Sequence, residues 1–531
     1  MDKQYFFSII INGHHPFVAP SQESGFSEEE RDFFEALSDT WLPLLELFEN
    51  MEKEGFPFQI GMVLSSSLCD MFQNNRLMER YLHWLDKRIA FGSRELKRCA
   101  SNKDTMALAE QYYKRDCWRK TAITEHYNMD LLTVFSDFQK RGRLEILLTS
   151  ATQSFLPFYV SMEEAIRAHI ETALIHHRKY FGRIPPGFWL PELGWTEKLG
   201  DYLVEYGIKY TITNAHALIL GDPPAENGIY YPVKSSSGLV LFGQDSSAVQ
   251  DLEQTLHSRL EVFRSSHDVG YEISQKALKQ VLDSINGRCS TGYCYWAGSG
   301  KNKRLYYNPQ LAEEKTAIAA KEFLKLRLTR LETASLYLEN PISIWTFDAD
   351  IMLRSWYEGT FFLKNVIKEI IYGENNLQHC TPGGYLDSPI RPLQQIEPCF
   401  SSALKNGYAE PLLDASNDWI YRHIFRSVQR MAEMTERFSE DTGLKERALN
   451  QAARELLFAQ STDWSKALNP QYQGRINKEY AKKELLGALR NFTTIYEALG
   501  SGHISTEWLT SLERKHCFLP HMNHRVFGRK K

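Results

Sequence analysis

Ile342-Ser-Ile-Trp-Thr-Phe-Asp348 and Gly187-Phe-Trp-Leu-Pro-Glu-Leu-Gly-Trp195 are two short apolar stretches, far apart in the chain, that each contain one carboxylate. Each begins like a buried β-strand, because its apolar residues follow one another without a charged residue between them. Each then reaches an acid, Asp348 in the first stretch and Glu192 in the second. Packing explains an acid at such a place poorly, so we expect both carboxylates to have a chemical role.

Further apolar runs alternate with helical patterns along the chain. Strands separated by helices favour a parallel α/β architecture, and a barrel of this kind builds its site from the loops that leave the carboxyl ends of its strands. The predicted strands cover residues 5–11, 59–64, 144–149, 187–190, 209–213 and 341–347, and the polar residues that follow them include Asn12, His14, Gln153, Asn214 and His216.

The remaining patterns define the expected domains. Residues 27–53 and 161–180 have the periodicity of amphipathic helices, and the second begins with a capping box, Ser161-Met-Glu-Glu164. Residues 222–306 interrupt the alternation, while 419–438 and 446–460 have the pattern of long helices. We therefore expect a catalytic barrel (1–221 and 307–380), an inserted, mostly helical subdomain (222–306) and a C-terminal α-helical domain (381–531).

The composition is typical of a soluble globular protein. The 531 residues are 43% hydrophobic and 24% charged, with a net charge of −4. No basic domain and no apolar run of membrane-spanning length stands out, so we expect neither nucleic acid nor a membrane as a partner. The eight cysteines contain no C-x-x-C pair and fit reduced thiols in the cytoplasm. The aromatic content of 13% suits a large aromatic core or surfaces on which sugars stack.

Five stretches, in the same order, resemble motifs of glycoside hydrolase family 57 and particularly of its α-1,4-glucan branching enzymes. Glu192 lies in the stretch that is similar to the family's nucleophile segment, and Asp348 in the one that is similar to its acid segment. The five stretches are Ile11-Asn-Gly-His-His-Pro-Phe-Val18, Trp189-Leu-Pro-Glu-Leu-Gly-Trp195, Phe347-Asp-Ala-Asp-Ile-Met-Leu-Arg-Ser-Trp-Tyr-Glu-Gly359, Ala459-Gln-Ser-Thr-Asp-Trp464 and residues 518–527.

This resemblance implies a (β/α)7 barrel with an inserted helical subdomain and a C-terminal helical domain. It implies a retaining double displacement in which Glu192 attacks the anomeric carbon, while Asp348 protonates the leaving oxygen and later deprotonates the acceptor. The two carboxyl groups would lie about 5–5.5 Å apart, and neither a metal nor an organic cofactor would be needed. The expected substrate contacts are His14, Gln153, Trp189, His216, Trp356, Asp463 and Trp464.

Several positions differ from the family's pattern. The catalytic carboxylates are kept, but much of the expected sugar-binding surround has changed. A lost hydrogen bond that strengthens in the transition state would cost a few kcal/mol. The substituted positions are Asn12 and Gln153 for histidines, Asp350 for a glutamate, Arg354-Ser355 for a His-Trp pair, Asn214 for an aspartate, His267 for an arginine, and Ala403 and Leu412 for tryptophans of the acceptor region.

Each of these residues also has a simpler explanation. Glu192 could be a surface acid, and Asp348 could be a helix N-cap. Asp463 and Trp464 could form a buried anchor between domains. A metal site at His14 and His15 lacks further ligands at a suitable spacing.

The sequence thus predicts a cytoplasmic, retaining enzyme that acts on α-1,4-glucan, such as glycogen, amylose or maltooligosaccharides. Branching is the first hypothesis, and α-amylase or 4-α-glucanotransferase activity is the second. A catalytically weakened homologue that binds glucan is the third. We expect a monomer or a small homo-oligomer.

Overall fold

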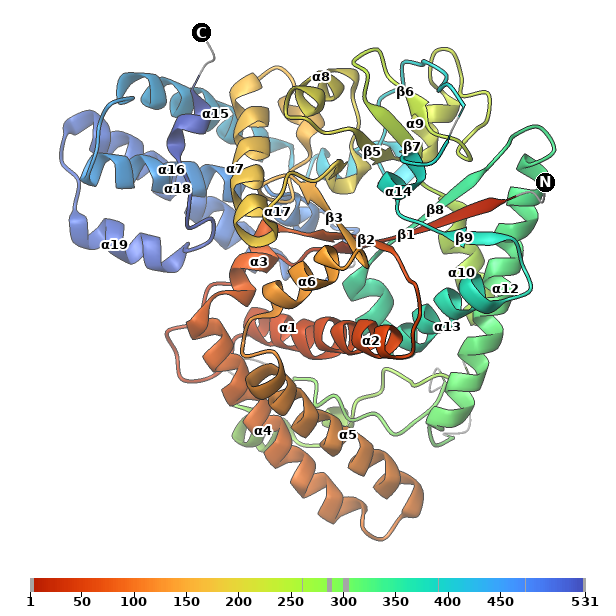
Figure 1. Cartoon of the computed structure of the whole chain (residues 1–531). Coiled ribbons are helices and arrows are strands. Elements are labelled where there is room, and N and C mark those ends of the chain that lie inside the picture. Colours follow the sequence, from red (N-terminus) through yellow and green to blue (C-terminus); the bar gives the residue numbers. More distant parts are fainter. Residues whose placement is uncertain are drawn as a thin grey trace.

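A curled sheet of parallel strands lies at the centre of the protein, and helices surround it, in the computed structural model of the chain (Figure 1). The structure describes residues 4–259, 261–283, 289–298, 305–389, 391–472 and 474–528. Neighbouring strands of the central sheet pair in parallel, in the order β7 (Val240–Gly243), β5 (Tyr210–Thr213), β4 (Gly187–Trp189), β3 (Leu144–Thr149), β2 (Ile60–Leu64), β1 (Tyr5–Gly13) and β8 (Ile342–Asp348).

The two edges of this sheet meet. Gln244, directly after β7, forms a parallel bridge with Ile344 in β8, and the Asp245 amide donates to the Ile344 carbonyl at 2.9 Å. Within the described residues, seven parallel strands therefore form a distorted barrel, which confirms the predicted (β/α)7 fold. Two short strands lie outside the ring: β6 (Val233–Lys234) pairs with β7, and β9 (Leu377–His379) pairs with β1.

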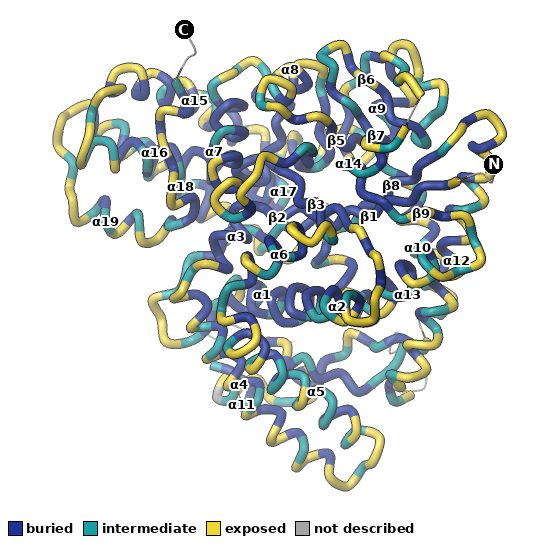
Figure 2. The backbone as a smooth tube through the Cα atoms, viewed as in Figure 1, coloured by how far each residue is buried: buried dark blue, intermediate teal, exposed yellow. Residues whose placement is uncertain are grey.

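All six predicted strands are present. Every residue of β1, β2 and β3 is buried, because one face of the sheet packs inside the barrel and the other packs against helices (Figure 2). The register of β1 on β8 pairs Asn12 with Asp348. Both residues lie at the carboxyl ends of their strands, where a barrel of this type places its site.

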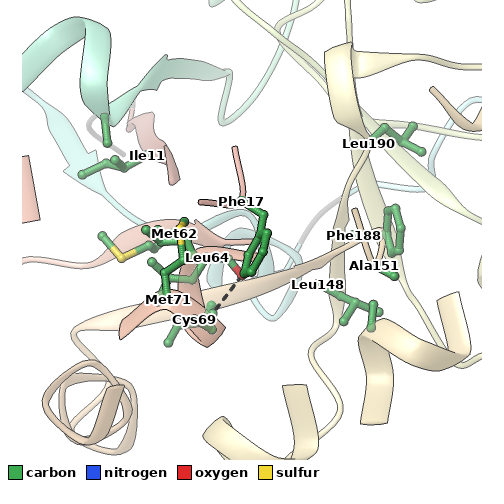
Figure 3. Packing of buried hydrophobic residues seen from close by; sticks show 14 of the residues in the cluster. Ile11, Phe17, Met62, Leu64, Cys69, Met71, Leu148, Ala151, Phe188 and Leu190 are labelled. Carbon is green, nitrogen blue, oxygen red and sulfur yellow. Dashed lines mark hydrogen bonds between the residues drawn. The ribbon is translucent and has the colours of Figure 1, made fainter. Parts of the chain in front are cut away.

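Apolar side chains fill the space between the strands and the surrounding helices. Met62 and Leu64 of β2 pack there with Met71 and with Phe17, which follows β1 (Figure 3). The helices that follow the barrel strands are α1 (Glu28–Ala36), α2 (Leu42–Lys53), α3 (Ser66–Phe72), α6 (Leu131–Lys140), α7 (Glu163–Phe181), α8 (Glu197–Glu205), α9 (Ala215–Ile219), α10 (Ser247–His257), α12 (Pro309–Ala334), α13 (Gly359–Tyr372) and α14 (Pro382–Leu386).

Both predicted amphipathic helices form, with one difference at a cap. The helix predicted over 27–53 is α1 and α2, which one π-helical turn joins, and Ser27 and Glu30 form a capping box at its start. The capping box predicted at Ser161 is wrong. The N-cap residue of α7 is instead Met162, whose side chain makes no capping hydrogen bond. A tight turn ends at Met162, and the Met162 carbonyl accepts a hydrogen bond from the Ala165 amide at 3.0 Å.

The described residues between 222 and 306 differ from the expected, mostly helical insertion. Its first part supplies β7 to the barrel sheet, so the barrel continues to Gly243. Its later part packs against α4 (Asn75–Cys99) and α5 (Lys103–Thr121), a helical hairpin from an earlier region of the chain (Figure 1). The only α-helix of the described residues between 261 and 298 is α11 (Gln275–Leu282), and residues 299–304 lie outside the described part. A subdomain assembled from two distant segments therefore lies against the barrel.

Helices form the C-terminal part of the chain from residue 418 onward. The long helices predicted over 419–438 and 446–460 are confirmed as α15 (Asp418–Arg437) and α16 (Leu444–Ala459). Residues 391–414 instead run along the barrel, with bridges from Glu397 to Asp222 and from Ser401 to Trp195. The remaining helices are α17 (Thr462–Leu468), α18 (Lys478–Ser501) and α19 (Thr506–Lys515). Among the described residues, none of the helices is both long enough and apolar enough to span a membrane.

Candidate active site

An unusual backbone turn holds Glu192. After β4 the chain enters the short 3-10 helix Pro191–Leu193, where Glu192 and Leu193 both have positive φ angles, of 57° and 49°. This conformation is unfavourable for residues other than glycine, and it recurs at functional sites. The Ala403 amide donates to the Glu192 carbonyl at 2.7 Å and helps to hold the turn. The side chain of Glu192 is 11% exposed.

Asp348 ends β8 at the same rim of the barrel. Its Oδ1 accepts a hydrogen bond of 2.6 Å from Nδ2 of Asn12. Solvent reaches Asp348, but protein atoms surround much of it, and this burial raises the pKa of the carboxyl. The Asn12 hydrogen bond lowers that pKa, and the nearby Glu192 carboxylate raises it. The structure thus brings the two predicted carboxylates close enough to interact.

Glu192 contacts a lysine, Lys466, that the sequence did not predict as part of the site. Nζ of Lys466 lies 2.7 Å from Oε1 of Glu192, and Oγ1 of Thr462 donates to the same oxygen at 3.4 Å. Burial disfavours the ammonium, but Glu192, followed by Asp463 and Asp348, holds the pKa of Lys466 above its usual value. No motif in the sequence distinguishes Lys466, because its role depends on how α17 docks onto the barrel.

His14 and Asp463, two predicted substrate contacts, contact each other. Nε2 of His14 lies 3.0 Å from Oδ1 of Asp463, and its Nδ1 lies 3.1 Å from Oγ of Ser65. Oγ of Ser461 donates to Oδ2 of Asp463 at 2.7 Å. Although Asp463 is buried, which raises its pKa, His14 and these hydrogen bonds lower it overall. A polar network therefore joins the end of β1 to α17.

The other predicted contacts differ in their positions. The Gln153 carbonyl accepts from the Thr462 amide at 2.6 Å, so this residue docks α17 onto the barrel. Trp189 is 5% exposed in the barrel interior, and Trp464 is 1% exposed with its indole N–H donating to the Phe458 carbonyl at 2.7 Å. These positions favour the buried-anchor explanation for Trp464. Trp356 packs between Phe263 and Phe362, at ring distances of 5.6 and 5.1 Å.

His216 belongs to an aromatic group beside the Glu192 turn. Its Nε2 lies 3.1 Å from the Tyr408 hydroxyl, and the Tyr408 ring stacks on Phe400 at 6.3 Å with an interplanar angle of 8°. Phe400 and Tyr408 are 38% and 42% exposed. Exposed, parallel aromatic faces are suitable for stacking with sugar rings.

A cavity of about 620 Å³ adjoins the segment that follows Asp348. Its walls come from α1, from residues 264–268 and 289–294, from 354–357 and from 475–480. Two arginines on these walls pair with acids: Arg354 contacts Asp32 and Asp350, and Arg475 contacts Asp32 and donates to Oγ of Ser355 at 2.9 Å. Walls that carry both acids and arginines offer many donors and acceptors, which suits a polyhydroxyl ligand.

A metal centre has no support from the residues that the structure describes. Among them, no group of three or more His, Cys, Asp and Glu side chains could hold a metal ion. The expectation that the chemistry needs no cofactor stays a prediction.

Comparisons with known proteins agree with this architecture. The glycosyl hydrolase family 57 profile matches residues 8–292, and a profile of the 1,4-alpha-glucan branching enzyme C-terminal region matches residues 423–527. A 1,4-alpha-glucan branching enzyme from Thermococcus kodakarensis is 24% identical over 515 residues, which cover 92% of this chain and 72% of that protein.

Two solved structures are similar over the full fold. The alpha-amylase AmyC from Thermotoga maritima superposes with a TM-score of 0.90 at 27% identity and covers 100% of both chains. The GH57-type branching enzyme from Pyrococcus horikoshii superposes with a TM-score of 0.86 at 20% identity, over 99% of this chain and 97% of that one. Since the family profile spans more than half of the sequence, the chain belongs to glycosyl hydrolase family 57.

Proposed function

We propose that this protein is a retaining α-glucan-active enzyme that forms α-1,6 branches in α-1,4-glucan. The observation that carries the proposal is the pair of carboxyl groups at the barrel rim, in contrasting environments. Glu192 lies against an ammonium, while burial and Glu192 raise the pKa of Asp348. Two carboxyl groups with such different surroundings suit a nucleophile and a proton donor.

The proposed reaction has two steps. Glu192 attacks the anomeric carbon of a glucosyl unit, the glycosidic bond breaks, and Asp348 gives its proton to the leaving oxygen. In the second step Asp348 takes the proton of a glucan 6-hydroxyl, whose oxygen displaces Glu192 from the anomeric carbon. The anomeric configuration is inverted twice and is therefore retained.

The cavity lined by residues 354–357, which follow Asp348 in the chain, supports a long substrate. A volume of about 620 Å³ is within the range of sites for small organic ligands. We infer that the cavity and the exposed rings of Phe400 and Tyr408 contact glucan units away from the bond that is cleaved. Such remote contacts orient the reacting unit.

Hydrolysis or 4-α-transfer is the second candidate. The similarity to an alpha-amylase at 27% identity over the complete chain favours it. The acceptor distinguishes the three reactions, because water gives hydrolysis, a 4-hydroxyl gives linear transfer and a 6-hydroxyl gives a branch. The third candidate is a catalytically weakened homologue that binds glucan, because several pocket positions are substituted. Cytoplasmic location and a monomer or small homo-oligomer stay predictions.

The decisive experiment is to incubate the protein with amylose, debranch the product and determine its chain lengths. We expect new α-1,6 branches, whereas new reducing ends alone would indicate an amylase and altered linear chains a 4-α-glucanotransferase. Glu192→Gln should abolish the activity, and Glu197→Gln, an exposed glutamate at the start of α8, is the matched control. Full activity in Glu192→Gln would refute the assigned nucleophile.

A further inference from the structure

Lys466 is held in place by the docking of α17 onto the barrel. Ser461, directly before this helix, forms a bridge with Ser154, and the Thr462 amide donates to the Gln153 carbonyl at 2.6 Å. Thr462 and Lys466 are one helical turn apart and therefore lie on the same face of the helix. Both contact the same atom, Oε1 of Glu192.

This geometry leaves the second carboxylate oxygen for the reaction. An oxygen that pairs with an ammonium at 2.7 Å is oriented by that contact, so attack on the anomeric carbon falls to Oε2. A side chain that is fixed in this way loses less freedom when it reaches the transition state.

The ammonium also separates the roles of the two carboxyl groups. Two neighbouring carboxylates repel each other, so one of them tends to hold a proton. Lys466 bonds to Glu192, whereas the partner of Asp348 is the neutral amide of Asn12. We propose that Lys466 is a positioning residue that holds Glu192 as the nucleophile and leaves Asp348, whose hydrogen-bond partner is neutral, as the proton donor. This inference rests on the proposed function.

The same arrangement is suited to the second step. Once Glu192 is bound to the sugar as an ester, it carries no charge and no longer repels the Asp348 carboxylate. Lys466 lowers the pKa of Asp348, so the remaining ammonium stabilises Asp348 in its ionised form. Asp348 can then act as the base that takes the acceptor's proton.

The test compares Lys466→Met, which removes the charge, Lys466→Gln, which keeps a hydrogen-bond donor, and Lys466→Arg, which keeps the charge. Lys482→Met, at an exposed position on α18, is the control. The measurements are kcat/KM against pH with α-glucosyl fluoride and with amylose. Fluoride leaves without a general acid, so the fluoride substrate reports on Glu192 alone.

We expect Met and Gln to lower kcat/KM about 100-fold near neutral pH and, with amylose, to move the alkaline limb to higher pH, because the Asp348 carboxyl loses a nearby ammonium that lowers its pKa. Arg should restore activity to within about tenfold. An unmoved alkaline limb in both uncharged variants, or higher activity in either, would overturn the inference. The Gln variant keeps the test valid if Met does not fold.

The outcomes also separate this inference from the proposed function. A wild-type protein that processes neither substrate contradicts both. An active wild-type protein whose Lys466 variants match the Lys482→Met control contradicts only the role of Lys466.

Discussion

Replacing Asn12 with leucine should raise the pKa of Asp348. Asn12 donates one hydrogen bond of 2.6 Å to the carboxylate, and that bond favours the ionised form. Leucine has a similar size but no donor. The Oδ1 atom of Asn12 is buried without a hydrogen-bond partner in the described structure, so its removal should cost little stability. Asn12→Leu therefore tests the electrostatics of the acid with little disturbance of the fold.

The size of the effect follows from the strength of one charge-assisted hydrogen bond. Such a bond contributes about 1.5–3 kcal/mol in a buried setting, and a shift of one pKa unit corresponds to about 1.4 kcal/mol. Asp348 is exposed, so water will replace part of the lost contact. We therefore expect a rise of about half to one pKa unit.

The measurement is the alkaline limb of kcat/KM against pH, because activity falls where the general acid loses its proton. This limb should move to higher pH in Asn12→Leu and stay in place in Ser8→Ala, a control in the same strand. A shift to lower pH, or none, would refute the assignment of Asp348 as the acid that Asn12 tunes. Substrates with a good leaving group should show a smaller effect.

Two further predictions concern the cavity and the stability of the helical part. Arg475→Met removes a contact with Ser355 at the cavity and should raise KM for amylose about three- to tenfold while kcat stays nearly constant, and an unchanged KM would argue against glucan in the cavity. His516 is buried, which disfavours its charge, but Glu455 at 2.8 Å raises its pKa from 6.5 to about 9. The resulting stabilisation is complete below pH 6.5 and lost as the pH rises to about 9, so urea unfolding should show a fall of about 3 kcal/mol over this range. His516→Gln should remove this slope.

The barrel strands could be predicted because parallel strands are buried on both faces. A strand such as β1 is therefore an uninterrupted apolar run. The short strand β7 also lies in an apolar run, Leu239-Val-Leu-Phe242, but it has only four residues and comes just after a Ser- and Gly-rich turn. It is a strand because β5 pairs with it and because the bridge at Gln244 closes the barrel. The local sequence does not show which strands such a run pairs with, so the sequence places these residues in the insertion.

The local sequence identifies Glu192 and Asp348 in the same way, but it does not identify Lys466. A carboxylate at the end of an apolar run is visible in the sequence, because local packing gives it no reason to be there. Lys466 lies on a short helix where a lysine is unremarkable, and it is 274 residues from Glu192 in the chain. Its role depends on the contacts of Ser154 and Gln153 with α17. In the proposed mechanism, the barrel supplies the reacting groups, while the helical C-terminal part supplies the charge that distinguishes one carboxyl from the other. Variants that loosen this docking should lower activity because Glu192 is no longer held in position, even though both carboxyl groups remain.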